Sequence, residues 1–391
     1  MKHHSSDRRR LRLLPASRPT AISRRRCLQA MGAAAVGLLA AGCRSRSNAE
    51  ATLPTAGAAT AAPTQVRAEP AARVAIAKAA SYDRALVRKQ VRALVDGIGG
   101  LDDLVKGRPR VAIKVNLTGG TSSKAVPGVP PIESFVTHPE VVRALGEAVR
   151  EAGARELFIV EAVYERASYS QWGYDDVAKA LGATLIDLND PHPYGEFATV
   201  PVGQNAFIYE SFSLNHLLQE IDTFISVAKI KCHWIAGVTL SMKNLFGLAP
   251  LQLYRRDPQD TYRSLFHGAE SETGKRVPRI VMDLNRARPI HLALLDGIKT
   301  VEGGEGPWID TMRPIAPGVL IAGKNPVATD AVATAVMGFD PRGSYPAAPF
   351  VHGDNHLNLA ADLKLGTNHL DEIEVVGATI NGVRQQFRPA A

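Results

Sequence analysis

RVAIKVNLTGG, residues 110–120, joins an apolar run of β-forming residues to a polar loop that ends in two glycines. The run Arg110–Val115 predicts a short buried strand, and the glycines predict a loop directly after it. Downstream, Pro139–Ala152 has apolar residues at helical spacing, and Glu156–Val160 (ELFIV) predicts a second strand. A strand, a helix and a strand in this order favour a parallel sheet.

The alternation of strand and helix continues over the rest of the chain from about residue 72. The predicted strands are short and almost continuously apolar, which is typical of a sheet buried on both faces. We therefore predict an α/β fold over residues 72–391, with a mostly parallel, doubly wound sheet and helices on both faces. The other predicted strands are Arg73–Ala77, Thr184–Leu188, Asp222–Val227, Ile290–Leu295, Val319–Ala322 and Glu372–Val376, and the other predicted helices are Leu86–Ile98, Tyr174–Leu181 and Pro326–Met337.

Residues 1–43 have the organisation of a signal peptide. Their basic part ends in SRRRCLQ, residues 23–29, which resembles a twin-arginine export signal with Cys27 in place of the usual Phe. The apolar run that follows is about a dozen residues long, whereas a spanning helix needs about 20. We therefore expect export by the twin-arginine machinery.

LAAGC, residues 39–43, resembles a lipobox and predicts a lipid anchor on Cys43, which would place the protein at the periplasmic or envelope side of a membrane. Ordinary signal cleavage nearby is the alternative. Residues 44–71 are rich in Ala, Thr and Pro, and we expect a disordered stalk there. Cys232 is then the one cysteine of the folded domain, so a disulfide within the chain is not expected.

Nearly all of the net charge lies in the leader. Residues 1–69 hold 12 Lys or Arg against three Asp or Glu, whereas the whole chain has a formal net charge of +8. The remainder therefore has no positive field to offer to phosphates, and we expect no nucleic-acid partner.

Lys229–Gly247 is the segment richest in reactive side chains, and it follows the predicted strand Asp222–Val227. Ligands of such sheets bind beyond the carboxyl ends of the strands, so this segment is a candidate site for a small-molecule ligand. A lysine among apolar neighbours, such as Lys243, has a lowered pKa and is a better nucleophile. His233 can bind metal or move protons. The alternative is that the lysines only extend along the surface and His233 is an ordinary loop residue.

Thr137 and Glu140 match the capping-box pattern, and Pro139 suits the first turn of a helix. This pattern predicts that the helix begins here. His138 is then incidental, or it serves as an acid or base at the edge of the sheet.

Asp296 and Glu302 fall in a glycine-containing stretch after the predicted strand Ile290–Leu295. They are candidate ligand-binding residues, with a plain flexible loop as the alternative. Asn325, which precedes a proline, predicts a helix N-cap, and Asp330 one turn later is a further candidate.

In these segments the chain resembles the bacterial and archaeal family called domain of unknown function 362. Many members carry a cysteine-rich ferredoxin segment, but one cysteine cannot hold an iron–sulfur cluster, which needs about four, so we expect no cluster. The matching segments are 113–117, 137–140, 151–154, 229–247, 296–303 and 325–330. The candidate cofactor-binding residues on them are Lys114, Asn116, Lys243, Asn244, Asp296, Glu302 and Asp330.

Two of the segments are also similar to the lactate racemase family. In that family a catalytic histidine lies ten residues before a lysine that is joined to a nickel pincer nucleotide, and His233 and Lys243 have the same spacing. A second catalytic histidine opens a helix there, as His138 does here. The resemblance implies that the two histidines are an acid–base pair and that Lys243 is a catalytic or attachment lysine. It implies a nickel pincer-type nucleotide or a divalent metal as cofactor, with His267 and Cys232 as candidate ligands, although the family's Gly-Gly-Arg run before the lysine is absent.

Three interpretations remain open from the sequence. The first is an exported, cofactor- or metal-dependent enzyme, isomerase- or racemase-like, acting on a small polar substrate. The second is a non-catalytic envelope protein that binds a ligand or a metal, and the third is an accessory protein of an iron–sulfur or redox system. A catalytic site predicts that His138, His233 and Lys243 lie within reach of one substrate.

Overall fold

The computed structural model describes residues 72–390, apart from residues 125 and 127. These residues belong to one compact unit, Val66–Ala391. The predicted signal peptide, Cys43 and the predicted stalk lie outside the described residues. In the part of the chain that the structure describes, no helix has both the length and the hydropathy needed to cross a membrane.

The described residues contain one ten-stranded sheet with the order β12-β1-β11-β9-β7-β2-β3-β4, in which the short strands β10 and β8 pair with β9 and β7. Strands β4, β3, β2, β7 and β9 are parallel, whereas β11 runs antiparallel to both β9 and β1. The predicted mostly parallel α/β sheet is therefore confirmed. The strands are β1 (Ala72–Lys78), β2 (Arg110–Lys114), β3 (Glu156–Glu161), β4 (Thr184–Asp187), β7 (Thr223–His233), β8 (Gly237–Thr239), β9 (Leu292–Glu302), β10 (Arg313–Ile315), β11 (Val319–Gly323) and β12 (Ile373–Gly377), and a separate hairpin is formed by β5 (Phe197–Pro201) and β6 (Ser211–Asn215).

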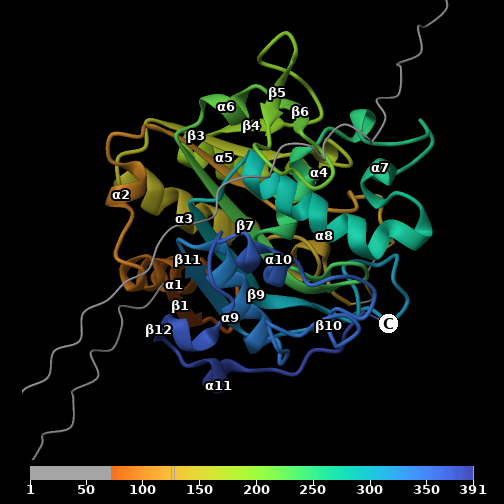
Figure 1. Ribbon diagram of the computed structural model, residues 1–391. Coiled ribbons are helices and arrows are strands. Elements are labelled where there is room, and N and C mark those ends of the chain that lie inside the picture. The colour runs from red at the N-terminus through yellow and green to blue at the C-terminus, as the bar shows by residue number, and fades with distance from the viewer. Residues whose placement is uncertain (1–71, 125, 127, 391) are drawn as a thin grey trace, which may run out of the picture. The chain divides into compact units, whose positions relative to one another are not determined.

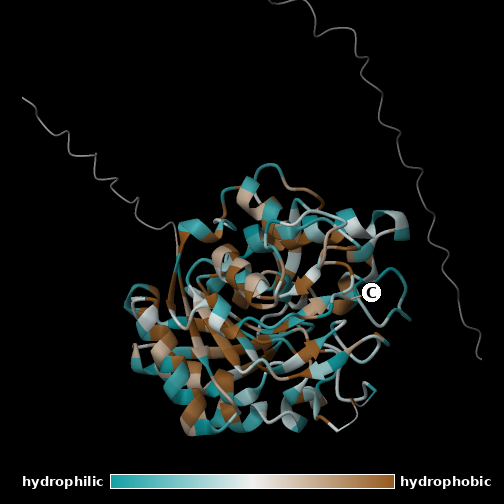
Figure 2. Cartoon of the chain, turned by 90° about the horizontal axis from the view of Figure 1, so that it is seen from below, coloured by the Kyte–Doolittle hydropathy of each residue, from teal (hydrophilic) through white to brown (hydrophobic). Residues whose placement is uncertain are grey.

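Helices cover both faces of the sheet, as Figure 1 shows. Successive strand residues point to opposite faces, so Ile113 and Ile225 join the core beneath α1, α3 and α5, whereas Ala112 and Phe224 join the core beneath α8 and α10. A third apolar cluster lies beneath α9. Figure 2 shows the hydrophobic residues concentrated in the strands and on the inner sides of helices. The helices are α1 (Arg84–Gly97), α2 (Asp102–Val105), α3 (Pro139–Glu151), α4 (Ala167–Gln171), α5 (Tyr174–Leu181), α6 (Leu217–Glu220), α7 (Ser264–His267), α8 (Glu270–Ala287), α9 (Pro326–Val336), α10 (His356–Asp362) and α11 (Ile380–Val383), with short 3₁₀ segments η1 (Pro131–Glu133), η2 (Lys243–Leu248), η3 (Leu251–Leu253) and η4 (Leu370–Glu372).

Two strands are longer than the sequence predicted. Strand β7 continues to His233 and β9 continues to Glu302, so Lys229 and Asp296 lie inside strands and the prediction that they follow strands is wrong. Lys229 Nζ and an Asp296 carboxylate oxygen are 2.8 Å apart, and both side chains are fully buried. Because the two charges compensate each other, both residues can be buried within their strands. The sequence prediction ended each strand at its last apolar residue and therefore ended these two strands too early.

The start of α3 also differs from the predicted capping box. His138 is the N-cap, and its Nδ1 accepts a hydrogen bond from the main-chain N–H of Glu140 at 3.2 Å. Thr137 instead donates its hydroxyl to the carbonyl of Val227 at 3.1 Å, which ties the loop to β7. The Glu140 carboxylate forms an ion pair with Arg84 at 2.9 Å rather than turning back to the cap.

Helix α8 is absent from the prediction because Gly274 and Pro278 interrupt its pattern. Pro278 has no N–H to donate to the carbonyl of Gly274 one turn earlier. That carbonyl instead accepts the N–H of Asp354 at 2.9 Å, so the helix continues without an unsatisfied group. The predicted N-cap of α9 is confirmed, since the side chain of Asn325 accepts the N–H of Ala328 at 2.9 Å.

Candidate functional site

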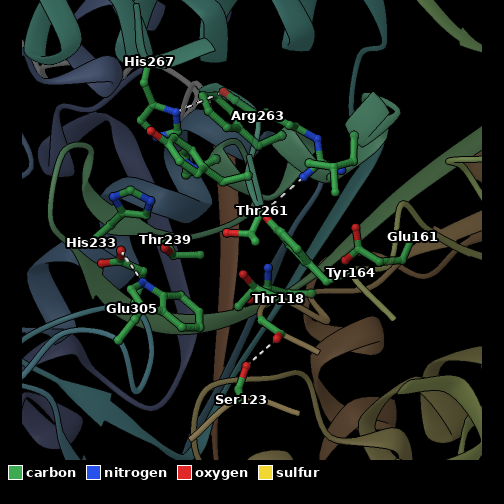
Figure 3. A pocket seen from close by; sticks show the side chains of 18 of the residues that line it. Thr118, Ser123, Glu161, Tyr164, His233, Thr239, Thr261, Arg263, His267 and Glu305 are labelled. Atoms are coloured by element: carbon green, nitrogen blue, oxygen red, sulfur yellow. Dashed lines mark hydrogen bonds between the residues drawn. The ribbon is translucent and has the colours of Figure 1, made fainter. Parts of the chain in front are cut away.

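A cavity of about 890 Å³ opens where strands β2, β3 and β7 end. The 3₁₀ segment Lys243–Leu248 and residues from the stretch 251–263 form other parts of its wall. Figure 3 shows His233, Thr239 and Glu305 on one side of this space and Glu161 and Tyr164 on another. Ligands bind at this edge in sheets of this class, so the cavity is the candidate site.

The structure brings some of the sequence-predicted site residues together here and places others elsewhere. The predicted residues that line the cavity are Lys114, Asn116, His233, Lys243, Asn244 and His267. The predicted residues that do not line it are His138, Cys232, Asp296, Glu302 and Asp330.

Lys243 presents an amine to the cavity. Its side chain is almost completely buried, and Nζ lies 3.7 Å from the centroid of the Phe246 ring. Within the described residues, Nζ has no hydrogen-bond acceptor and no carboxylate partner. Burial lowers the pKa of Lys243 to about 7; the Glu305 carboxylate opposes this shift, and the charge of Arg263 adds to it. A large fraction of this amine is therefore neutral near neutral pH, although the Phe246 ring face favours its charged form.

Asp330 acts on the turn that carries Lys243. From α9 its carboxylate accepts the main-chain N–H of Ser241 at 3.0 Å, the Ser241 hydroxyl at 2.6 Å and the N–H of Met242 at 3.0 Å. Burial raises the pKa of Asp330 to about 7. The residue is thus a positioning residue that fixes the backbone immediately before Lys243.

Lys114 and Glu161 form a buried ion pair at 2.9 Å on the wall of the cavity. Lys114 Nζ also donates to the carbonyl of Val115 at 2.7 Å and to Asn244 Oδ1 at 3.1 Å. Burial lowers the pKa of Lys114 and raises the pKa of Glu161, but three acceptors around Nζ favour an ionised ammonium. Gly247 lies against the pair, and a Cβ there would approach Lys114 Nζ to 2.6 Å and collide with the Glu161 carboxylate.

The two cavity histidines are held as opposite tautomers. His233 Nδ1 accepts the main-chain N–H groups of Ile235 at 3.1 Å and Ala236 at 3.2 Å, so a neutral His233 carries its proton on Nε2. His267 Nδ1 lies 3.1 Å from the carbonyl of Arg263 and must donate to it, which leaves a lone pair on Nε2. Burial lowers the pKa of His233 well below its usual value and that of His267 to about 4. Near neutral pH the cavity therefore holds one imidazole donor and one imidazole acceptor.

Two further buried basic side chains line the cavity. Lys231 Nζ donates to the carbonyl of Phe135 at 2.6 Å, and burial lowers its pKa to about 7. Arg263 donates from Nε to the carbonyl of Ala249 at 2.6 Å. Neither residue forms an ion pair with any carboxylate of the described chain. The Glu305 carboxylate, which also lines the cavity, instead accepts a main-chain N–H and an indole N–H.

Sequence reasoning did not select Lys231, Arg263, Glu161 or Glu305 as site residues. Glu161 ends strand β3, so the rule that sites follow strands could have found it. Arg263 carried no such signal, because it reaches the cavity from a long irregular segment.

His138 belongs to a different cluster. Its ring stacks on Tyr82 with a centroid distance of 3.7 Å, and its main-chain N–H donates to Asp296 at 3.0 Å. Asp296 in turn pairs with Lys229. The structure therefore does not bring His138 into the cavity with His233 and Lys243, and the predicted acid–base pair of histidines is not assembled there.

The residues present fit a nickel pincer-type cofactor only in part. The free amine of Lys243 suits an attachment point, but His138, the predicted second catalytic histidine, does not line the cavity. Cys232 is fully buried, its Sγ lies 3.1 Å from the carbonyl of Arg388, and burial raises its pKa, so it does not join His267 as a metal ligand. Among residues 72–390, apart from 125 and 127, no group of three His, Cys, Asp or Glu side chains is arranged to hold a metal ion.

The profile of a family described as "Domain of unknown function (DUF362)" matches residues 111–335. A thylakoid-associated protein of Synechocystis is 26% identical over 312 residues, which cover 77% of this chain and 85% of that protein. Among solved structures, the chain is similar to the lactate racemase apoprotein from Thermoanaerobacterium thermosaccharolyticum, with a TM-score of 0.35, 14% identity and coverage of 62% of this chain and 54% of that one. A protein from Thermotoga maritima is also similar, with a TM-score of 0.30, 11% identity and coverage of 64% and 57%. This chain therefore spans little more than half of either solved structure.

Proposed function

This chain belongs to the family described as domain of unknown function (DUF362), and we propose that it is an enzyme, isomerase- or racemase-like, that acts on a small polar carbonyl compound through the amine of Lys243. The observation that carries the proposal is the environment of that amine. It faces the cavity, it has no acceptor among the described residues, and burial keeps its pKa near 7. Lysines desolvated in this way are the ones that form imines with carbonyl substrates.

The reaction follows from the groups around the amine. Neutral Lys243 Nζ attacks the carbonyl carbon, and the carbonyl oxygen leaves as water with one proton from the amine and one from solvent, so that a C=NH⁺ iminium forms. The positive nitrogen acidifies the C–H bond of the adjacent carbon, whose proton the free Nε2 lone pair of His267 can accept. The Nε2–H of His233 donates a hydrogen bond to the oxygen that leaves. Return of the proton to the same carbon on either face, followed by hydrolysis of the imine by water, inverts the configuration at that carbon, which is racemisation or epimerisation, and restores the amine.

Reductive trapping tests the proposal. The purified protein is incubated with 2-oxoglutarate or pyruvate and sodium borohydride, and the modified peptide is located by mass spectrometry. We expect a stable adduct on Lys243 that is absent from Lys243→Arg, which keeps the charge but lacks the nucleophile. Lys299→Arg is the matched control, because Lys299 pairs with Glu133 and does not line the cavity.

Exchange of the substrate's α-hydrogen in D₂O, followed by NMR, then reports turnover. An adduct spread over surface lysines, or one unchanged in Lys243→Arg, would refute the imine mechanism. Binding without adduct or exchange would favour the non-catalytic binding protein. If the protein is instead an accessory protein of a redox system, neither an adduct nor hydrogen exchange should appear unless a partner protein is added.

We further propose that the protein is exported and held at a membrane by lipid on Cys43. The support is the twin-arginine-like SRRRCLQ and the lipobox-like LAAGC of the leader. A relative is named as thylakoid-associated, which agrees with a membrane-associated location.

The envelope fraction of cells that express the full chain tests the location. We expect a mature N-terminal peptide beginning at Cys43 with the added mass of acyl chains. Cys43→Ser should lose this mass, and the double change Arg24→Lys with Arg25→Lys should leave the precursor in the cytoplasm. An unmodified Cys43 in a mature exported protein would refute the anchor but not export.

A further inference from the structure

The charges on the cavity wall do not balance, and this imbalance indicates what the cavity binds. Four basic side chains that are at least nine-tenths buried line it: Lys114, Lys231, Lys243 and Arg263. The buried carboxylate of Glu161 pairs with Lys114. The half-buried carboxylate of Glu305 is the second one near the lysines, so this buried protonated set exceeds the carboxylates around it by two charges.

The less buried part of the wall adds Arg255, Glu165 and Asp260, so the whole wall has five basic and four acidic side chains. The Glu165 carboxylate is taken up by the hydroxyls of Thr121 and Ser122, and the Asp260 carboxylate by the hydroxyl of Ser264.

Arg263 is the fixed part of this excess, because a guanidinium does not lose its proton in proteins. Its Nε donates to the carbonyl of Ala249 at 2.6 Å and its Nη2 to the carbonyl of Ala162 at 3.3 Å. These carbonyls satisfy its hydrogen bonds but do not neutralise its charge. A buried charge without a counter-charge is strongly unfavourable, so a negatively charged ligand is the natural complement.

Lys231 and Lys243 form the adjustable part. Besides Lys243, the charged groups around Lys231 are Glu305, Lys229 and Glu161. Besides Lys231, those around Lys243 are Glu305, Arg263 and Lys114. His233 and His356 also lie near Lys243 and are neutral near pH 7, because burial lowers the pKa of each. Burial is the main reason that both amines lose protons easily in the absence of a ligand, and the neighbouring basic groups add to this effect against the opposing charge of Glu305.

We propose that the substrate of this cavity is a small dianion, carrying either two carboxylates or one phosphoryl group, and that its binding is coupled to proton uptake by Lys231, because Lys243 must be neutral to attack the carbonyl carbon. The proposal rests on the site of the proposed function and names its substrate class. In the imine state, protonated Lys231, Arg263 and the iminium are positively charged and Glu305 is negatively charged. The remaining positive charge would match a dianion. The buried hydroxyl oxygen of Thr239, which lacks a partner among the described residues, adds an uncommitted polar group to the same wall.

Calorimetry on the full chain tests the proposal with ligands that cannot form an imine. Succinate and inorganic phosphate are the dianions, acetate is the monoanion and succinamide is the uncharged analogue of succinate. We expect at least one dianion to bind at least about tenfold more tightly than acetate or succinamide, a ratio typical of one additional charge-assisted contact. Stronger binding of succinate identifies a dicarboxylate, and stronger binding of phosphate identifies a phosphoryl group.

The pH dependence supplies the second measurement. Affinity should fall by about tenfold per pH unit above about pH 7 for each lysine that takes up a proton. The heat of binding should also change with the ionisation enthalpy of the buffer. Lys231→Gln should weaken dianion binding and reduce the pH slope, whereas Lys299→Gln should change neither. If Lys231→Gln does not fold, the affinities of the unmodified chain for the four ligands still test whether the cavity prefers dianions.

Equal affinity for acetate and succinate, the absence of dianion binding, or an affinity independent of pH would overturn the inference. These outcomes differ from failure of the proposed function. Dianion binding without borohydride trapping refutes only the imine chemistry. Trapping of pyruvate on Lys243 without any preference for dianions refutes only the substrate class.

Discussion

Gly247→Ala is expected to break the ion pair on the cavity wall. The glycine has no left-handed backbone requirement, so its importance lies in the space that a side chain would need. An added Cβ would come within 2.6 Å of Lys114 Nζ and would collide with the Glu161 carboxylate. The two charged groups, now 2.9 Å apart and almost fully buried, would have to separate or leave their hydrogen bonds.

The size of the effect follows from the cost of disrupting a buried pair. Breaking such a pair lowers the free energy of unfolding by about 3–5 kcal/mol. Replacing glycine by alanine raises it by about 0.4–1 kcal/mol, because alanine restricts the conformations of the unfolded chain. We therefore expect the free energy of unfolding to fall by about 2–4.6 kcal/mol. Urea denaturation followed by circular dichroism and tryptophan fluorescence measures this change, and coincident transitions justify a two-state analysis.

Gly195→Ala is the matched control, because Gly195 is exposed, has no left-handed backbone requirement and has no atom within 4 Å of an added Cβ. It should be neutral or slightly stabilising. A Gly247→Ala protein whose free energy of unfolding lies within about 0.5 kcal/mol of the unmodified chain, the range of ordinary surface substitutions, would refute the close approach described here.

Three further predictions concern Lys243, Asp330 and His138. Acylation of Lys243 by a small activated ester, read by peptide mass spectrometry, should reach half its maximal rate near pH 7 because burial lowers its pKa to about 7; a midpoint above about pH 10, the ordinary lysine value, would contradict this environment. Burial raises the pKa of Asp330 to about 7, so the stability that this group contributes is present below its unfolded pKa and is lost as pH rises from about 4 to 7. The free energy of unfolding should fall over this range by at most about 1.4 kcal/mol per pH unit. Urea denaturation should show that Asp330→Asn lacks this pH dependence, and an identical dependence in the variant would contradict the raised pKa. His138→Ala should lower the free energy of unfolding by about 1 kcal/mol through loss of the N-cap, whereas borohydride trapping on Lys243 should be unchanged. His138→Asn should restore the stability, because asparagine is also a good N-cap. Loss of trapping in both variants would indicate that His138 is catalytic.

The sheet could be predicted because burial on both faces leaves a pattern within each strand. Arg110–Val115 and Glu156–Val160 were located within one residue of their observed ends, since their apolar runs stop where the strands stop. The prediction failed where a polar pair continues a strand, as Lys229 and Asp296 do. It also failed where a proline is tolerated, as in α8, because the freed carbonyl finds a donor far away in the sequence.

For the site, local sequence patterns showed which segments are rich in reactive side chains and that one of them follows a predicted strand, which was enough to select His233, Lys243 and Asn244. Lys114 was selected through the family resemblance. The tertiary structure alone decided that His138 and Asp296 form a separate buried cluster and that Arg263 joins the cavity. Residue types and their spacing depend on local chain geometry, which a sequence records. The charge balance of a cavity depends on which distant segments meet there and on how much water they exclude, and no local pattern contains that information.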